Sequence, residues 1–131
     1  PALASGGATA GGSYLLSAKQ RYTSRVLAGS SRLRSLSSST TESEEVKGWL
    51  EEERGEGGWG DFKGAGYLLS NAFRRSSSTP PEKLVTVQKW RKLEKGVEEW
   101  GRGKKGYGEV EALLGEYLES VELGEVVAGG K

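Results

Sequence analysis

The sequence predicts an all-α protein, an up-and-down four-helix bundle with one broken helix, on three observations. Apolar residues recur every three or four positions along several segments, which is the period of an amphipathic helix. No segment alternates with the period of two that a half-buried strand requires. Short Gly-, Ser- or Pro-rich stretches separate the segments, so consecutive helices should lie antiparallel. We expect a flexible arm over residues 1–12, the bundle over 13–124 and a flexible C-terminal tail over 125–131.

The first predicted helix spans residues 15–36. Its apolar stripe runs through Leu15, Ala18, Tyr22, Val26, Gly29, Leu33 and Leu36. Ser13 is the predicted N-cap, because its hydroxyl can accept a hydrogen bond from a free N–H of the first turn. The serines and threonines of residues 37–41 predict the end of this helix.

The second predicted helix is in two pieces. The first piece begins at the predicted cap Ser43, carries Val46, Trp49 and Leu50, and ends at the glycines of residues 55–58. The second piece carries its apolar residues at helical spacing, namely Trp59, Phe62, Gly66, Leu69 and Phe73.

The third and fourth predicted helices follow two further breaks, at residues 76–81 and 101–106. Thr79 is the predicted cap of the third helix, and Pro81 is expected in its first turn, where the missing N–H of proline does no harm. The fourth helix begins at Tyr107. We expect the large side chains of these stripes to form the core, in particular Trp49, Phe62, Leu69, Trp90, Leu93 and Tyr117.

Six glycines fall inside the predicted helices, at positions 29, 48, 64, 66, 96 and 115. Each destabilises a helix by about 0.5–1 kcal/mol relative to alanine, so together they cost on the order of 3–6 kcal/mol. Either close helix packing recovers part of this cost, or the chain is stabilised by what it binds, and we favour the second explanation.

The net charge of +1 conceals four blocks of alternating sign. Residues 1–40 carry +5, residues 41–66 carry −5, residues 67–108 carry +6 and residues 109–131 carry −5. Such blocks suit an antiparallel bundle in which oppositely charged helices become neighbours. The simpler interpretation, which we adopt here, is that they are solvated helix faces whose ion pairs contribute a few tenths of a kcal/mol each.

The composition argues against an enzyme. Cysteine, methionine and histidine are all absent, so the commonest general base, the thiol nucleophile and the usual zinc ligands are missing. We therefore expect no catalytic residue, cofactor or metal. Residues 55–60 fit the G-x-G-x-x-G pattern of dinucleotide-binding loops, but an acidic helical segment precedes them instead of a strand, so we do not expect a dinucleotide site there. No apolar run approaches the roughly 20 residues that span a bilayer.

A small basic-faced nucleic-acid- or protein-binding helical module is one alternative function. Residues 74–105 are basic and contain Trp90 and Trp100, which could stack on bases. Both tryptophans fall on the apolar stripe, however, and a net charge of +1 is low for a phosphate binder. We therefore expect no nucleic-acid partner.

Several segments follow one another in an order that resembles a known family. After the basic first helix come Val46-Lys47-Gly48-Trp49-Leu50, Trp59, the helix end Asn71-Ala72-Phe73-Arg74, a Pro-Glu-Lys-Leu helix opening and a short basic break before Tyr107. This order resembles the PsbQ family of photosystem extrinsic proteins, which are four-helix bundles at the thylakoid lumenal surface. Residues 67–75 and 117–123 are similar to PsbQ-like proteins of algae with secondary plastids.

The resemblance implies a non-catalytic extrinsic subunit that stabilises a photosystem supercomplex, with photosystem II at the lumenal face as the first candidate. A photosystem I peripheral subunit that bridges core and antenna is the alternative. The implied partners are photosystem core and antenna proteins. The implied location is the plastid thylakoid, peripheral to the membrane and on the lumenal rather than the stromal side.

We expect a basic face to dock the chain onto an acidic partner. The candidate residues lie in the first helix and near the ends of the bundle, and they are Lys19, Arg21, Arg25, Arg32, Arg34, Arg74, Arg75, Lys104 and Lys105. Some of them must pair with the acidic segments inside the fold. Arg21, Arg25 and Arg32 should share one helix face, because they are spaced by four and seven residues.

Overall fold

The computed structural model describes residues 12–37 and 44–124, and within them the chain is helical with no strand. The elements are α1 (Gly12–Ser35), α2 (Glu44–Glu51), α3 (Trp59–Asn71), the short 3₁₀ helix η1 (Pro81–Lys83), α4 (Val85–Gly101) and α5 (Tyr107–Ser120). The all-α prediction is confirmed. Residues 1–11, 38–43 and 125–131 lie outside the described residues, so the expected cap Ser43, most of the expected arm and the expected tail lie outside them too.

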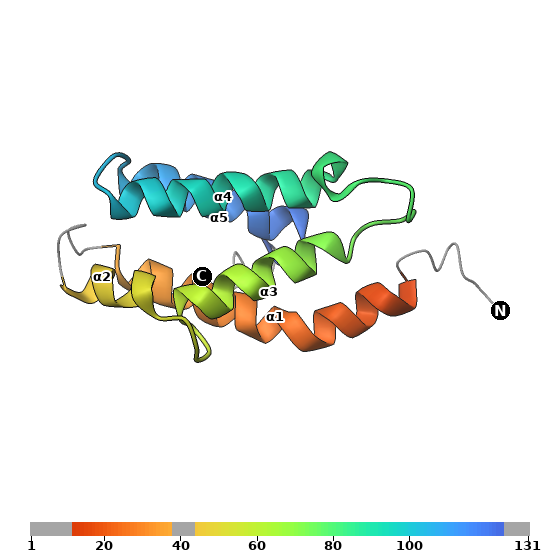
Figure 1. The fold of residues 1–131 in the computed structure, drawn as a ribbon, viewed down its shortest axis with the longest axis horizontal. Helices are drawn as coiled ribbons and strands as arrows, with labels where there is room; N and C mark the ends of the chain where they lie inside the picture. The colour runs from red at the N-terminus through yellow and green to blue at the C-terminus, as the bar shows by residue number, and fades with distance from the viewer. Residues whose placement is uncertain (1–11, 38–43, 125–131) are drawn as a thin grey trace.

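The helices form two pairs. α1 packs against α3, α4 packs against α5, and α3 also contacts α4 (Figure 1). α2 precedes α3 at one end of the molecule, where α1 and α4 also end (Figure 1). We call this end, which holds Trp49, Trp59 and Trp100, the tryptophan end. The opposite end, where α1 and α4 begin and α3 ends, is the arginine end, after Arg74 and Arg75.

The core is a chain of aromatic rings that crosses the bundle. All six predicted core residues are buried, so that prediction is confirmed. The Trp90 ring lies at the centre, with its centroid 5.4 Å from that of Phe62 and 5.1 Å from that of Tyr117, both edge-on. Trp59 links this group to Trp49, at a centroid distance of 5.3 Å. Edge-to-face pairs of this kind add to the free energy gained by burying the rings.

A small buried polar network ties α3, α4 and α5 together. The carbonyl oxygen of Gly66 accepts hydrogen bonds from the Tyr117 hydroxyl at 2.9 Å and from the Ser70 hydroxyl at 2.6 Å. Thr86, in the first turn of α4, donates its hydroxyl to the carbonyl oxygen of Ser70 at 2.7 Å. Burial raises the pKa of Tyr117 above its ordinary value, because the ionised phenol would lose its hydration.

The interior glycines divide into two groups. A Cβ atom on Gly29 would lie 2.4 Å from the Phe62 ring, and one on Gly66 would lie 2.5 Å from the Trp90 ring. A Cβ on Gly96 would lie 2.6 Å from a methyl group of Leu113. The other three, at positions 48, 64 and 115, face open space. Close packing therefore accounts for half of these glycines, although we favoured stabilisation by a partner.

Two helix starts differ from the prediction. α1 begins at Gly12, so Ser13 stands inside the helix and is not its N-cap. Pro81 opens the 3₁₀ helix instead of α4, because Leu84 is extended (φ −78°, ψ 133°) and interrupts the helical path. Leu84 is the N-cap residue of α4, so Thr79 does not cap that helix.

Candidate docking surface

Four of the five basic residues of α1 pair with acidic residues of other segments. Lys19 pairs with Glu122, Arg25 with Asp61, Arg32 with Glu52 and Arg34 with Glu111. These four acidic residues lie in or next to α2, α3 and α5. All four belong to the two acidic blocks of the sequence, residues 41–66 and 109–131. The ion pairs therefore join a basic block to an acidic one, as the antiparallel arrangement of charge blocks suggested.

Arg25 is the most firmly held of these cations. Its Nη2 donates to Asp61 Oδ1 at 2.7 Å and its Nε donates to the same oxygen at 3.0 Å. Asp61 stands in the first turn of α3, where the helix dipole also favours a carboxylate. The hydrogen bond to Asp61 raises the pKa of Arg25 above its ordinary value. Arg25 thus ties α1 to α3.

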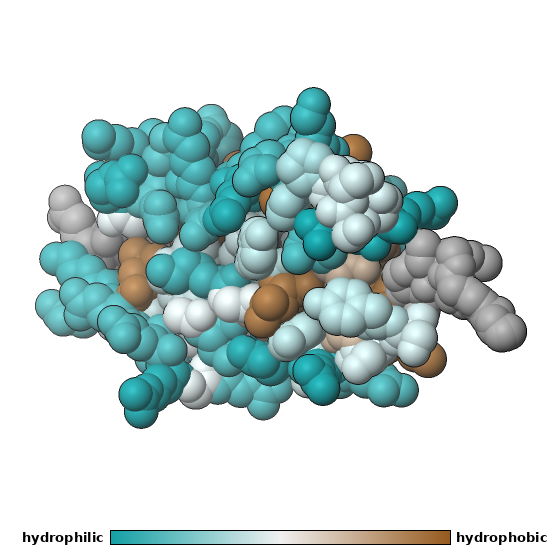
Figure 2. Space-filling view, turned by 45° about the vertical axis from the view of Figure 1, so that its right-hand side comes forward, coloured by the Kyte–Doolittle hydropathy of each residue, from teal (hydrophilic) through white to brown (hydrophobic). Residues whose placement is uncertain are grey.

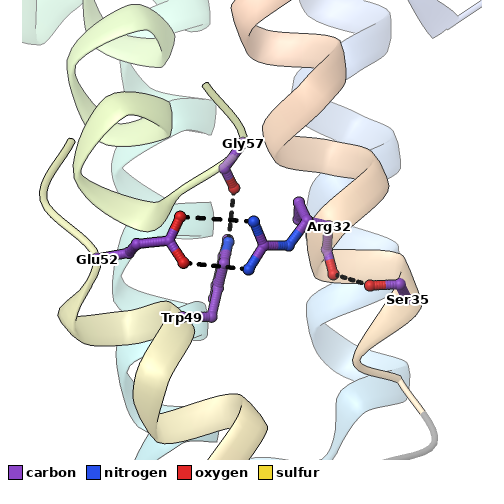
Figure 3. Close-up of polar contacts among 5 residues, drawn as sticks. All are labelled: Arg32, Ser35, Trp49, Glu52 and Gly57. Carbon is purple, nitrogen blue, oxygen red and sulfur yellow. Dashed lines mark hydrogen bonds and ion pairs between the residues drawn. The ribbon is translucent and has the colours of Figure 1, made fainter. Parts of the chain in front are cut away.

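Arg32 lies at the tryptophan end and faces Glu52, with both guanidinium Nη atoms directed at its carboxylate (Figure 3). The shorter contact, from Nη2 to Glu52 Oε2, is 3.2 Å. Beside it, the indole Nε1 of Trp49 donates to the carbonyl oxygen of Gly57 at 2.7 Å (Figure 3). Gly55 and Gly57 have φ values of 94° and 95°, which few residues other than glycine adopt. Residues 55–58 therefore separate α2 from α3, and the break predicted there is confirmed.

Near the break between α4 and α5, Lys105 also has acidic partners. Its Nζ is 3.4 Å from Glu99 and 3.1 Å from Glu109. It lines a hollow of about 220 Å³ together with Lys92, Lys95, Gly96, Glu99 and Leu113. Three lysines and one glutamate line this hollow, so its lining is basic but also includes an acidic side chain.

Of the nine predicted docking residues, five take part in these ion pairs: Lys19, Arg25, Arg32, Arg34 and Lys105. Arg74 donates from Nη1 to the carbonyl oxygen of Thr79 at 3.3 Å. Arg21, Arg75 and Lys104 are exposed and have no ion-pair partner within the described residues. The structure therefore does not gather the nine residues into one free face, and the role of each in docking stays a prediction.

Arg74 and Arg75 line a hollow of about 220 Å³ at the arginine end. The residues around it are Tyr14, Asn71, Arg74, Arg75, Ser76 and Ser77. They come from the first turn of α1 and from the end of α3 with the loop that follows. Tyr14 and Asn71 were not among the predicted docking residues. The sequence indicated the exposure of Tyr14 only through its position outside the apolar stripe of α1.

The large exposed hydrophobic side chains gather at the same end. Tyr14 is 61% exposed, Leu16 59% and Val85 62%, and Leu68 is also exposed. Each lies within the first or last turns of its helix at the arginine end. Figure 2, which turns this end toward the viewer, shows hydrophobic residues on the surface among polar ones. The arginine end thus combines apolar side chains with arginines.

The described part of the chain contains no cluster of acidic side chains that could hold a metal ion. None of its helices has the length and hydropathy needed to cross a membrane. Trp90 and Trp100, which base stacking would require at the surface, are buried.

Comparison with known proteins gives no relative. The chain matches no protein-family model, and searches of curated proteins and of solved structures find no match to it.

Proposed function

We propose that this chain is a non-catalytic extrinsic subunit that docks onto a photosystem supercomplex and stabilises it, with photosystem II at the thylakoid lumenal face as its partner. We also propose that the fold is an up-and-down four-helix bundle, in which α2 and α3 together count as one broken helix. Both proposals rest on the resemblance to the PsbQ family.

The order of the helices supports this proposal. A long α1 with basic residues in its last turn is followed by α2 and α3, which the glycine turn separates. A proline-containing segment precedes α4, and a short loop with Lys104 and Lys105 precedes α5. The basic first helix, the proline-containing helix opening and the basic break thus occur in the order in which the resemblance has them.

The arginine end is the single observation that carries the docking function. Arg75 lies there without an ion-pair partner among the described residues, and it lines the same hollow as Tyr14, which the fold leaves exposed. Contact surfaces of subunits commonly combine arginine with aromatic and aliphatic side chains. An acidic partner surface would be attracted to this end, and the attraction would weaken as salt screens the charges.

The test is separation of gently solubilised thylakoids by blue-native electrophoresis, with the chain followed by mass spectrometry. We expect it to migrate with photosystem II supercomplexes and to be released from the membranes by high salt. Migration with photosystem I would overturn the choice of partner. Absence from both complexes, or release by nuclease instead of salt, would overturn the function.

A rebinding assay on salt-washed membranes tests the docking end. Arg75→Glu should reduce rebinding at low salt, because it reverses a charge at the arginine end. Arg102→Glu is the matched control, since Arg102 is exposed at the tryptophan end and has no partner within the described residues. Equal loss in the two variants would count against docking through the arginine end. Arg25 and Arg32 are unsuitable for this test, because their reversal would place like charges beside Asp61 and Glu52.

A further inference from the structure

The hollow at the arginine end has the chemistry of an anion-binding site. None of the six residues that line it is acidic, while two carry a guanidinium group and three carry a hydroxyl. Arg75 has no ion-pair partner in the described part of the chain. Arg74 uses one of its five N–H donors on the carbonyl oxygen of Thr79, which leaves the others available.

Asn71, which lines this hollow, has an unsatisfied hydrogen-bond acceptor. Its side-chain Oδ1 is buried and has no hydrogen-bond partner within the described residues. A buried carbonyl oxygen without a partner is unfavourable. Because this oxygen can only accept a hydrogen bond, it calls for an occupant that carries a donor, such as a hydroxyl group, as well as an anionic group. The dipole of α3 favours cations such as Arg74 and Arg75 near its C-terminal end. The dipole does not account for the unsatisfied side-chain oxygen of Asn71 beside them.

The surroundings of the hollow decide which anion fits. Tyr14 lines it and is 61% exposed, and Leu16 and Val85 belong to the same end of the bundle. A soluble anion would leave these apolar side chains in water. At a membrane surface, by contrast, arginines meet anionic headgroups, while tyrosine and aliphatic side chains enter the boundary between headgroups and acyl chains.

We propose that the hollow binds the phosphate-bearing headgroup of an anionic membrane lipid, with the arginine end resting on the bilayer and Tyr14 at the headgroup level. Arg74 and Arg75 neutralise the phosphate, Ser76 and Ser77 donate hydrogen bonds to its oxygens, and Asn71 Oδ1 accepts a hydrogen bond from a hydroxyl group of the headgroup. This site goes beyond the proposed photosystem function, because it requires no protein partner. Pure lipid vesicles can therefore test it separately.

The experiment is co-sedimentation of the full chain with phosphatidylcholine vesicles, with and without phosphatidylglycerol. We expect binding to the vesicles that contain phosphatidylglycerol and little to the others. Arg75→Gln should weaken binding about fivefold, since one cation near an anionic surface contributes about 1 kcal/mol. Tyr14→Ser should weaken binding several-fold, because it removes apolar area from the bilayer contact.

The matched control is Arg102→Gln, which removes the same charge from the tryptophan end. It should leave vesicle binding unchanged. Equal weakening by Arg102→Gln and Arg75→Gln would show unspecific adsorption and overturn the site, as would failure to bind phosphatidylglycerol vesicles. Nitrogen-15 NMR titration with inorganic phosphate and glycerol 3-phosphate distinguishes the source of the phosphate. If either soluble anion binds as tightly as the vesicles, the hollow serves a soluble ligand and the lipid assignment is wrong.

Discussion

The tryptophan end and the arginine end of the bundle differ in how far their large side chains are buried and their charged groups are paired. At the tryptophan end, Trp49, Trp59 and Trp100 are almost completely buried, and the indole N–H of Trp49 is satisfied by the carbonyl of Gly57. Arg32 and Glu52 pair beside them (Figure 3). At the arginine end, Tyr14, Leu16 and Val85 are more than half exposed, and Arg75 has no ion-pair partner among the described residues.

This difference indicates which end is shaped for contact. Full burial of one large apolar side chain contributes about 1.5–3 kcal/mol, so the arginine end forgoes several such contributions in the isolated chain. The tryptophan end buries its large aromatic side chains, although Arg102 and Lys104 are exposed there without an ion-pair partner within the described residues. A second molecule or a membrane therefore has more to gain by covering the arginine end, whichever partner it proves to be.

The largest expected effect compares one aromatic residue from each end. Trp49→Ala should destabilise the fold by about 3–5 kcal/mol, because it opens a cavity beside Trp59 and removes the hydrogen bond to Gly57. Tyr14→Ala should change stability by no more than about 0.5 kcal/mol, since the side chain is mostly exposed. Urea denaturation followed by circular dichroism measures both changes. A cost above about 1 kcal/mol for Tyr14→Ala would mean that the arginine end is packed and the comparison fails.

The sequence predicted the tryptophan end better than the arginine end, for a physical reason. Burial of Trp49 and Trp90 follows from their positions on a stripe with helical period, which is a local property. The pairing of Arg25 with Asp61 joins residues 36 positions apart, so it depends on how α1 and α3 pack. The same holds for the hollow, which brings Tyr14 to the loop after α3. Helix periodicity finds core residues, but it does not reveal which cations the fold neutralises.

The next effect concerns two glycines of α3, the helix that connects the two ends. Gly66→Ala should destabilise the protein by about 1–3 kcal/mol, because its Cβ would lie 2.5 Å from the rigid, buried Trp90 ring. Gly64→Ala should stabilise it by about 0.5–1 kcal/mol, because it faces open space and alanine favours the helix. The urea midpoints of the two variants measure both effects. Stabilisation by both substitutions would show that α3 and α4 do not pack closely at Gly66 and Trp90.

The smallest effect concerns the last turns of α4 and α5, which end at opposite ends of the bundle with the same motif. At the tryptophan end, Gly103 is left-handed (φ 77°), and the N–H of Lys104 donates to the carbonyl of Glu99 at 2.8 Å. At the arginine end, Glu122 is left-handed (φ 68°), and the N–H of Leu123 donates to the carbonyl of Leu118 at 2.7 Å. Glycine is the usual residue at this position of a helix end, because a side chain there is strained by about 1 kcal/mol.

A side chain introduced at Gly103 should therefore lower the free energy of unfolding, and glycine introduced at Glu122 should raise it. Gly103→Ala should destabilise the protein by about 1 kcal/mol, which lowers the midpoint of thermal unfolding by roughly 3–5 °C. Glu122→Gly should relieve strain but also removes the ion pair with Lys19, an exposed pair that contributes about 0.2–1 kcal/mol. Measuring Glu122→Gly in a Lys19→Ala background removes the ion-pair contribution from the comparison. In that background we expect a gain of about 0.5–1 kcal/mol, and a larger gain there than in the parent chain. If Glu122→Gly destabilises the Lys19→Ala variant, the glutamate is not strained, and the arginine end stops its helix as favourably as the tryptophan end does.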